Sequence, residues 1–173
     1  MPTVYIGVGS NIDPETNIPA AIKLLAGRVK VRALSTFYAT APMCCRDSSY
    51  FINGVIAVET DIPPRELKHF VLREIEDSLG RVRTADKFAP RTIDLDIIVY
   101  GDRVIAEPGL TIPDPDVFTR AFMAAPLAEL APDLVMPGSG KRVDEIAGSL
   151  TDESMTPLHE FTAALSTEVV NES

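Results

Sequence analysis

An apolar run that contains two aspartates, residues 93–100, constrains the fold of this chain more than any other segment. Its residues alternate with the two-residue period of a β-strand, so Asp94 and Asp96 point to one face with their carboxylates about 6–7 Å apart. The remaining residues are strongly apolar, which is typical of a buried, central strand. Two like charges are costly to bury together unless cations compensate them. The strand therefore predicts a source of positive charge close to both aspartates.

Basic residues come directly before this strand. Arg81, Arg83, Lys87 and Arg91 lie within eleven residues of one another. Guanidinium groups match phosphate oxygens in geometry and charge, and paired carboxylates can bridge divalent cations. Together these residues predict a site for a polyphosphate and magnesium. The residues alone also allow a simpler interpretation, in which the aspartates form the wet face of a strand and the basic residues a solvated loop.

Length and composition place the chain among ordinary soluble proteins. Its 173 residues fit one domain, and its net charge of −9 argues against nucleic acid as a partner. No apolar run approaches the length of a membrane span, and the first residues lack the pattern of a signal peptide. The adjacent Cys44 and Cys45 cannot form a disulfide framework. We therefore expect a cytoplasmic protein without a membrane partner, and a monomer or weak homodimer.

The order of periodic segments predicts the fold class. Strand patterns and helix patterns follow one another as β-α-β-β-α-β, with strands at 4–8, 29–40, 51–60 and 93–100 and helices at 14–26 and 61–79. This order favours an α+β, ferredoxin-like fold, an antiparallel sheet with helices on one face. The apolar face of the second helix is expected to include Phe70 and Glu74. Asp102 and Arg103 have the character of a hairpin turn that leads into a strand at 104–105.

The last third of the chain is expected to add short helices to one domain over residues 1–150. Apolar patterning predicts two of them, around 118–123 and 126–130. Residues 151–173 are rich in Ser, Thr and Glu and weakly patterned. We interpret them as a peripheral tail with one short helix near 158–165.

Several sequence blocks, in order and at matching spacing, resemble the 6-hydroxymethyl-7,8-dihydropterin pyrophosphokinase family of folate biosynthesis. The resemblance covers roughly residues 4–146. Its most specific block, P-R-T-I-D-L-D, contains both aspartates. The blocks are G-S-N at 9–11, F-Y-A-T-A-P at 37–42, F-I-N at 51–53, G-R-V-R at 80–83, P-R-T-I-D-L-D at 90–96, and R-A-F-M with P-L-A-E-L-A-P between 120 and 132.

This resemblance implies an enzyme that transfers diphosphate from ATP to the primary alcohol of a pterin and releases AMP. It implies two Mg²⁺ ions on the triphosphate, held by Asp94 and Asp96, with Arg81 and Arg91 completing the catalytic set. By the same resemblance, the pterin-binding residues would be Thr40, Pro42, Met43, Phe51, Asn53 and Phe122. The ATP-binding residues would be Arg81, Arg83, Arg91, Ile97, Thr111, Asp114 and Arg120.

The chain departs from the family pattern at two basic positions. Asp114 stands where the family has a histidine that contacts phosphate, and Thr84 stands where some members carry lysine. These changes keep two other functions open. The chain could be a catalytically weak relative that senses a pterin or nucleotide. Alternatively, the unusual loop at 43–46 could serve diphosphate transfer to a different hydroxymethyl heterocycle. A plain regulatory module would not need both aspartates and Arg91 together.

Overall fold

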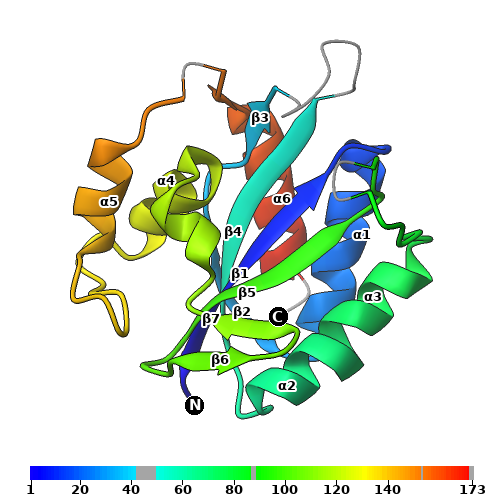
Figure 1. Cartoon of the computed structure of the whole chain (residues 1–173). Coiled ribbons are helices and arrows are strands. Elements are labelled where there is room, and N and C mark those ends of the chain that lie inside the picture. The colour runs from blue at the N-terminus through cyan, green and yellow to red at the C-terminus, as the bar shows by residue number, and fades with distance from the viewer. Residues whose placement is uncertain (42–49, 87–88, 153, 172–173) are drawn as a thin grey trace.

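The computed structural model describes residues 1–41, 50–86, 89–152 and 154–171. Within these residues, a six-stranded antiparallel sheet organises the chain around its first strand, β1, which lies between β4 and β5 (Figure 1). Beyond β4 lie β2 and β3, and a short strand near the C-terminus pairs with β3. The strands of this sheet are β1 (Thr3–Ser10), β2 (Lys30–Leu34), β3 (Tyr38–Thr40), β4 (Phe51–Glu59), β5 (Asp94–Tyr100) and β8 (Thr156–Pro157).

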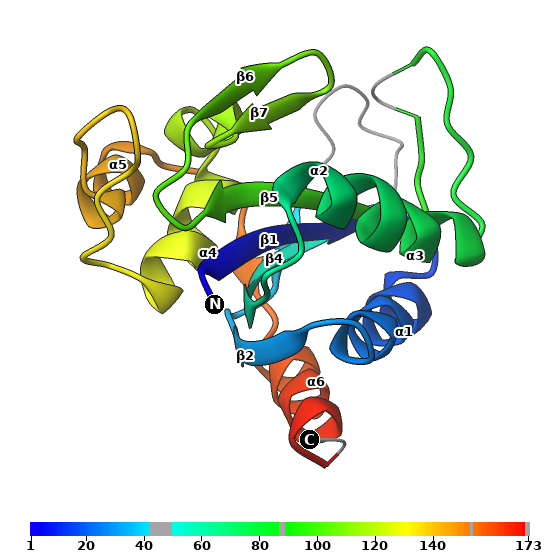
Figure 2. The same ribbon diagram turned by 90° about the horizontal axis from the view of Figure 1, so that it is seen from below.

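Helices cover both faces of the sheet, whereas the sequence predicted helices on one face. On one side lie α1 (Pro14–Ala26), the continuous helix over 64–78 and α6 (His159–Asn171); on the other lie α4 (Ala121–Leu130) and α5 (Val143–Ser149) (Figure 2). The second side is occupied because β5 carries Ile98 on that face and, after a register shift against β1, Val99 as well; both are buried in the cluster that includes residues of α4 and α5. The expected C-terminal helices therefore build a second core.

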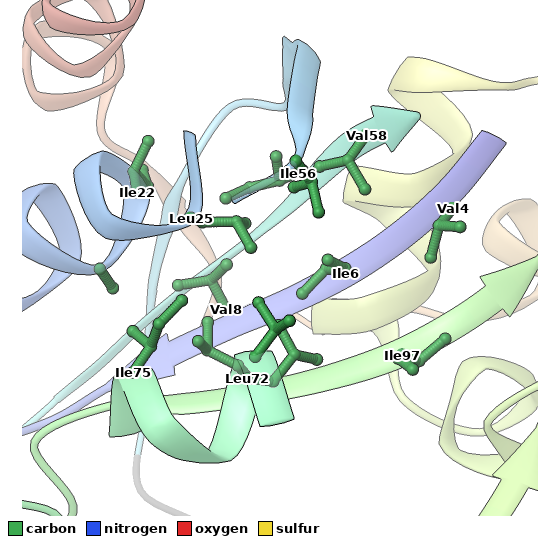
Figure 3. Close-up of a cluster of buried hydrophobic side chains, with 14 of the residues drawn as sticks. Val4, Ile6, Val8, Ile22, Leu25, Ile56, Val58, Leu72, Ile75 and Ile97 are labelled. Carbon is green, nitrogen blue, oxygen red and sulfur yellow. The ribbon is translucent and has the colours of Figure 1, made fainter. Parts of the chain in front are cut away.

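The first core fills the space between the sheet and α1, the helix over 64–78 and α6. Val4, Ile6 and Val8 alternate along β1 and point into it, as the two-residue period requires (Figure 3). From α1, Ile22 and Leu25 meet them at helical spacing. The sequence pattern of these two elements is thus explained by one shared buried layer.

The helix over 64–78 differs from the pattern expected of it. It begins as α2 (Pro64–Glu66), continues as a π-helical segment (Leu67–Leu72) and ends as α3 (Arg73–Ser78). In the wider π turn, residues four and five apart share a face rather than residues three apart. Phe70 is therefore 62% exposed, and it does not join the apolar face as predicted. Glu74 is exposed as well, while Glu76 is buried.

The strand predicted over 29–40 is interrupted. Leu34 pairs with Ile56 and Tyr38 pairs with Asn53, so four steps along one side match three along β4, which is the count of a β-bulge. Side chains satisfy the backbone here, since Ser35 Oγ accepts from Val55 N at 2.9 Å. The interruption lets Phe37 turn inward beneath Gly54, where it is fully buried.

The remaining connections also correct the sequence analysis. Asp102 and Arg103 lie in a turn, but the strand that follows, β6 (Ile105–Glu107), pairs with β7 (Leu110–Ile112) in a separate two-stranded sheet. A 3₁₀ helix (Pro115–Phe118) then leads to α4. Residues after 151 are more than a peripheral tail, because α6 packs on the first core and Leu165 is buried in it. In the described residues, no helix has the length and apolar character needed to cross a membrane.

Candidate active site

A small pocket opens on the face of the sheet that carries α4. Two rows of residues run across its floor, because the register places Asp94 beside Gly9 and Asn53, and Asp96 beside Gly7 and Val55. The predicted sharing of one face by the two aspartates is therefore confirmed. We call this the sheet pocket; its volume is about 40 Å³, and it is lined by Gly7, Val8, Gly9, Asn53, Gly54, Val55, Asp94, Asp96, Phe122 and Met123.

Glycines keep the middle of this floor open. A Cβ atom at Gly9 would lie 2.7 Å from Asn53 Oδ1, and one at Gly7 would lie 3.3 Å from Ile98 Cδ1. Both positions are on the central strand: Gly9 lies between Asp94 and Asn53, and Gly7 lies between Asp96 and Val55. From the sequence, Gly9 was identified only as part of the G-S-N block, and Gly7 was not identified. Alternation along β1 could have identified both as gaps on the face opposite Val8.

Asp94 is held by two arginines from the loop before β5. Arg81 Nη1 lies 2.5 Å from its Oδ1, and Arg91 Nη1 lies 3.0 Å from its Oδ2. Both carboxylate oxygens thus have a cationic partner. The predicted association of the acidic pair with nearby arginines is confirmed for this aspartate.

Asp96 has a different environment. Burial raises the pKa of its carboxyl to about 8, and the negative charges of Asp94, Asp114 and Glu76 add to this effect. An acid with such a pKa in a pocket is a candidate for cation binding, because a cation would relieve both causes of the shift. The arginines that neutralise Asp94 form no ion pair with Asp96 in the described part of the chain.

A second and larger depression lies beside the first. We call it the arginine cleft; its volume is about 340 Å³, and it is lined by Arg73, Arg81, Val82, Arg83, Thr84, Asp86, Ala89, Pro90 and Arg91. Asp94 connects the two, since it lines the sheet pocket and pairs with Arg81 and Arg91 of the cleft. Arg73, on the first turn of α3, is a member that the sequence analysis did not identify.

The Glu76 carboxylate accepts hydrogen bonds from two arginines of the cleft. Its Oε1 accepts hydrogen bonds from Arg81 Nη1 at 3.0 Å and from Leu95 N at 2.8 Å, and its Oε2 accepts from Arg83 Nη2 at 2.5 Å. Only 8% of its side chain is exposed, and burial raises the pKa of its carboxyl. One buried carboxylate therefore links β5 to two arginines of the cleft.

The turn after β1 fixes the segment that carries Arg91. Asn11 Oδ1 accepts from Arg91 N at 2.7 Å, and Asn11 N donates to Arg91 O at 3.2 Å. Ser10 Oγ donates to Thr92 O at 2.6 Å. The G-S-N block thus acts through the backbone of a neighbouring loop.

The residues assigned to a pterin lie partly around the sheet pocket. Asn53 and Phe122 line it, and Asn53 Nδ2 donates to the buried Thr40 Oγ1 at 2.9 Å. Phe51 is on the same face of β4 as Asn53, two residues earlier, but it is not part of the pocket lining. Pro42 and Met43 lie outside the described residues.

The residues assigned to ATP are more dispersed. Arg81, Arg83 and Arg91 share the arginine cleft. Ile97 points into the first core, so only its backbone faces outward. Thr111 is exposed on β7, Arg120 precedes α4, and neither lines the pocket or the cleft.

Asp114 has a structural role that the sequence analysis did not foresee. It caps the 3₁₀ helix, with Oδ1 accepting from Asp116 N at 2.9 Å. Burial raises the pKa of this half-buried carboxyl, and the charges of Asp116 and Asp94 contribute. The residue at the position of the family histidine therefore adds a negative charge near the acidic pair.

The carboxylates suit magnesium better than a metal caged entirely by protein. Among the described residues, no group of three or more His, Cys, Asp or Glu side chains could hold a metal ion. Mg²⁺ is usually held by one or two carboxylates together with substrate phosphates and waters. Asp94 and Asp96 match this requirement because they face a pocket that adjoins a cleft lined by arginines.

The structure places an acidic pair beside an arginine cleft, on an antiparallel sheet with helices on both faces. This arrangement is suited to binding a metal-complexed polyphosphate beside a second small ligand. Comparison with known families identifies the family to which the chain belongs. The family model for 7,8-dihydro-6-hydroxymethylpterin-pyrophosphokinase (HPPK) matches residues 5–132, and the chain belongs to this family.

Individual relatives agree with this assignment. The chain is 36% identical over 162 residues to the 2-amino-4-hydroxy-6-hydroxymethyldihydropteridine pyrophosphokinase of Haemophilus influenzae, covering 92% of this chain and 99% of that protein. It is also 37% identical over 160 residues to the folic acid synthesis protein fol1 of Pneumocystis carinii, covering 91% of this chain but 21% of that protein. The chain thus matches one relative almost end to end and about a fifth of the other.

Solved structures support the fold. A Plasmodium falciparum HPPK-DHPS structure superposes with a TM-score of 0.73 over 90% of this chain and 48% of that chain, at 13% sequence identity. At this identity the likeness concerns the fold alone. The chain corresponds to about half of that protein.

Proposed function

We propose that this protein transfers diphosphate from ATP to the hydroxymethyl group of 6-hydroxymethyl-7,8-dihydropterin, releasing AMP, as a step of folate biosynthesis. Membership of the HPPK family supports the activity. The observation that carries the proposal is the position of Asp94, which belongs to the sheet pocket and is paired with two arginines of the neighbouring cleft. A metal-binding carboxylate at such a junction serves a transfer between one ligand in the pocket and another in the cleft.

Different residues are assigned to the binding of each of the two substrates. Arg81 and Arg91, with Arg83, supply donors for the phosphate oxygens of ATP. Asn53 presents its amide to the edge of the pterin, and Phe122, with Phe51 nearby, supplies aromatic surface for its flat ring. These assignments are supported by the shared lining of the cleft and of the pocket. Thr40 fixes the orientation of Asn53 through their hydrogen bond.

The chemistry depends on positioning and charge. The hydroxymethyl oxygen forms a bond to the β-phosphorus, the bond from that phosphorus to the bridging oxygen of AMP breaks, and the alcohol proton is lost to solvent. We assign Asp94 and Asp96 to two Mg²⁺ ions, which when bound would neutralise charge on the triphosphate. The protein's own residues hold the alcohol and the phosphate in line.

The topology supports a further assignment. The strand order β5-β1-β4 with β2 beyond β4, all antiparallel, is the order expected of a ferredoxin-like β-α-β-β-α-β fold. We therefore extend the fold proposal to this topology, with β6, β7 and the C-terminal elements as additions. We also propose that the chain acts as a monomer or weak homodimer.

The activity is tested by incubating the protein with ATP, MgCl₂ and 6-hydroxymethyl-7,8-dihydropterin and measuring AMP. We expect AMP only when both the pterin and Mg²⁺ are present, in equal amount to the diphosphorylated pterin. Parallel reactions without pterin, and with other hydroxymethyl heterocycles, serve as controls. AMP formed at the same rate without pterin, or only with another alcohol, would contradict the proposal.

Gly9 provides a test of the pocket. Substituting Gly9→Val should raise the KM for the pterin by about tenfold, because the added side chain displaces the Asn53 amide and overpacks the floor. The KM for ATP should change less than about twofold. Gly148→Ala is the matched control, since a Cβ there meets no atom within 4 Å. An unchanged pterin KM in Gly9→Val would exclude this pocket as the pterin site.

Asp114 favours a second candidate function, a weakly active pterin or nucleotide sensor, because its charge adds to that of the acidic pair. The Asp114→Asn variant separates charge from structure, since asparagine keeps the helix cap and removes the charge. We expect its KM for ATP to fall by about three- to tenfold through lost repulsion. Asp133→Asn, at an 88% exposed side chain, is the control. An unmodified protein that binds pterin without releasing AMP would support the sensor. Equal KM values for ATP in Asp114→Asn and in the original protein would remove Asp114 from the ATP site.

A further inference from the structure

Helix α4 forms one wall of the sheet pocket with its first turn, and the opposite end of the helix is attached to the sheet. Phe122 and Met123, in the first turn of α4, line the pocket. Farther along, Met123, Ala124 and Leu127 pack on Val55, Ile98 and Val99 in the second core. Apolar contacts of this kind favour burial but specify direction weakly. Another interaction must fix where along the sheet the first turn of α4 lies.

Glu129, near the C-terminal end of α4, makes a directional contact of this kind. Its Oε2 accepts a hydrogen bond from Thr36 N at 2.9 Å, and its Oε1 accepts one from the Tyr38 hydroxyl. These partners lie at the interruption between β2 and β3, more than 90 residues earlier in the chain. Hydrogen bonds to a charged acceptor are shorter and stronger than neutral ones.

The helix geometry connects this contact to the pocket. Phe122 and Glu129 are seven residues apart, so they lie on nearly the same side of α4, about 10 Å apart along its axis. On the sheet, Tyr38 pairs directly with Asn53, and the Asn53 amide donates a hydrogen bond to Thr40 Oγ1. Glu129 therefore joins the helix side that presents Phe122 to the strand pair that presents Asn53.

We infer that Glu129, with Tyr38, is a positioning residue that sets the spacing between the Phe122 wall and the Asn53 wall of the sheet pocket. This inference rests on the proposed function for its ligand, the flat pterin, which must fit between these two walls. Glu129 itself touches neither substrate nor the reacting atoms. Its contribution is to the fit of the pterin and to the order of the first turn of α4.

Binding of the fluorescent 6-hydroxymethylpterin tests the inference in three variants. We expect Glu129→Ala to weaken binding by about three- to tenfold, Tyr38→Phe to weaken it by less, and Glu129→Gln to recover part of the loss through its remaining acceptor oxygen. The KM for ATP should stay within about twofold of its original value. Arg142→Ala is the control, because it removes ion pairs with Asp133 and Asp144 around α5 and none with the sheet.

Hydrogen exchange separates this inference from the activity itself. The amides of Met123 and Ala124 donate to Arg120 O at 3.1 and 3.0 Å in the first turn of α4. In Glu129→Ala these amides should exchange faster, while in Arg142→Ala they should not. Unchanged exchange, or equal loss of pterin binding in both variants, would overturn the inference. Faster exchange in a protein that makes no AMP would sustain the positioning role and reject the proposed function.

Discussion

Replacing Asp96 with asparagine is expected to lower the rate of AMP formation by about two to three orders of magnitude. A metal ion contributes several kcal/mol of charge stabilisation in phosphoryl transfer, and an amide oxygen holds Mg²⁺ more weakly than a carboxylate. The measurement is kcat for AMP release at saturating ATP and pterin over a range of MgCl₂ concentrations. Asp102→Asn, in the turn after β5, is a control outside both the pocket and the cleft. Retention of full activity by Asp96→Asn would remove this residue from the site.

The same substitution should increase the stability of the metal-free protein. Burial raises the pKa of Asp96 from 3.8 to about 8, so the native state binds the proton more tightly than the unfolded state. An acid with a raised native pKa costs the native state stability as the pH rises from about 4 to about 8. The Asp96→Asn variant does not lose this stability, because its side chain has no carboxyl group to ionise. In EDTA, its Tm should exceed the original value clearly at pH 8 and hardly at pH 4.5, and a constant difference across this range would contradict the argument.

Removing the Glu76 carboxylate should have the largest effect on stability. We expect Glu76→Ala to lower the free energy of unfolding by about 3–5 kcal/mol, because a buried ionic network loses its shared acceptor. Leu95 N and two arginines lose a partner at the same time. Urea denaturation measures the change. The exposed Asp77, which also pairs with Arg83, is the matched control, and Asp77→Ala should cost less than about 1 kcal/mol.

ATP binding by the same variants tests the link to the site. Glu76→Gln keeps an acceptor for Leu95 N and should fold with a smaller loss of stability. Because the glutamine no longer neutralises and orients Arg81 and Arg83, the Kd of this variant for ATP should still change by about fivefold or more. If Glu76→Gln bound ATP as the original protein does, Glu76 would serve the fold alone.

The sequence was sufficient wherever function depends on local period. The placement of Asp94 and Asp96 on one face followed from alternation along a single strand, and the register with β1 agrees with it. Glu76 could not be found in this way, because the π-helical segment before it changes the period and turns Phe70 outward. Period alone placed Phe70 and Glu74 wrongly on the buried face of that helix.

Features that join distant segments were also beyond the sequence. The bulge between β2 and β3 depends on Ser35 and Val55, and the contact of Glu129 with Tyr38 joins α4 to β3. Likewise, α6 became part of the first core although its sequence is weakly patterned, because Leu165 is buried there and Phe161 and Val169 pack against the same core. Such contacts are selected by packing among elements, which no single segment encodes.

The pairing of Asp94 with Arg81 and Arg91 has a consequence for how binding responds to ionic strength. In the structure these arginines already have a protein carboxylate as counter-ion. If the phosphates of ATP bind these arginines and Mg²⁺ binds Asp94, as we propose, the ligands replace partners within the protein rather than ions drawn from solution. Binding of the metal–nucleotide complex is then a double exchange of counter-ions, in which few salt ions are released. The affinity should therefore depend on salt much less steeply than a cleft lined by four arginines would suggest.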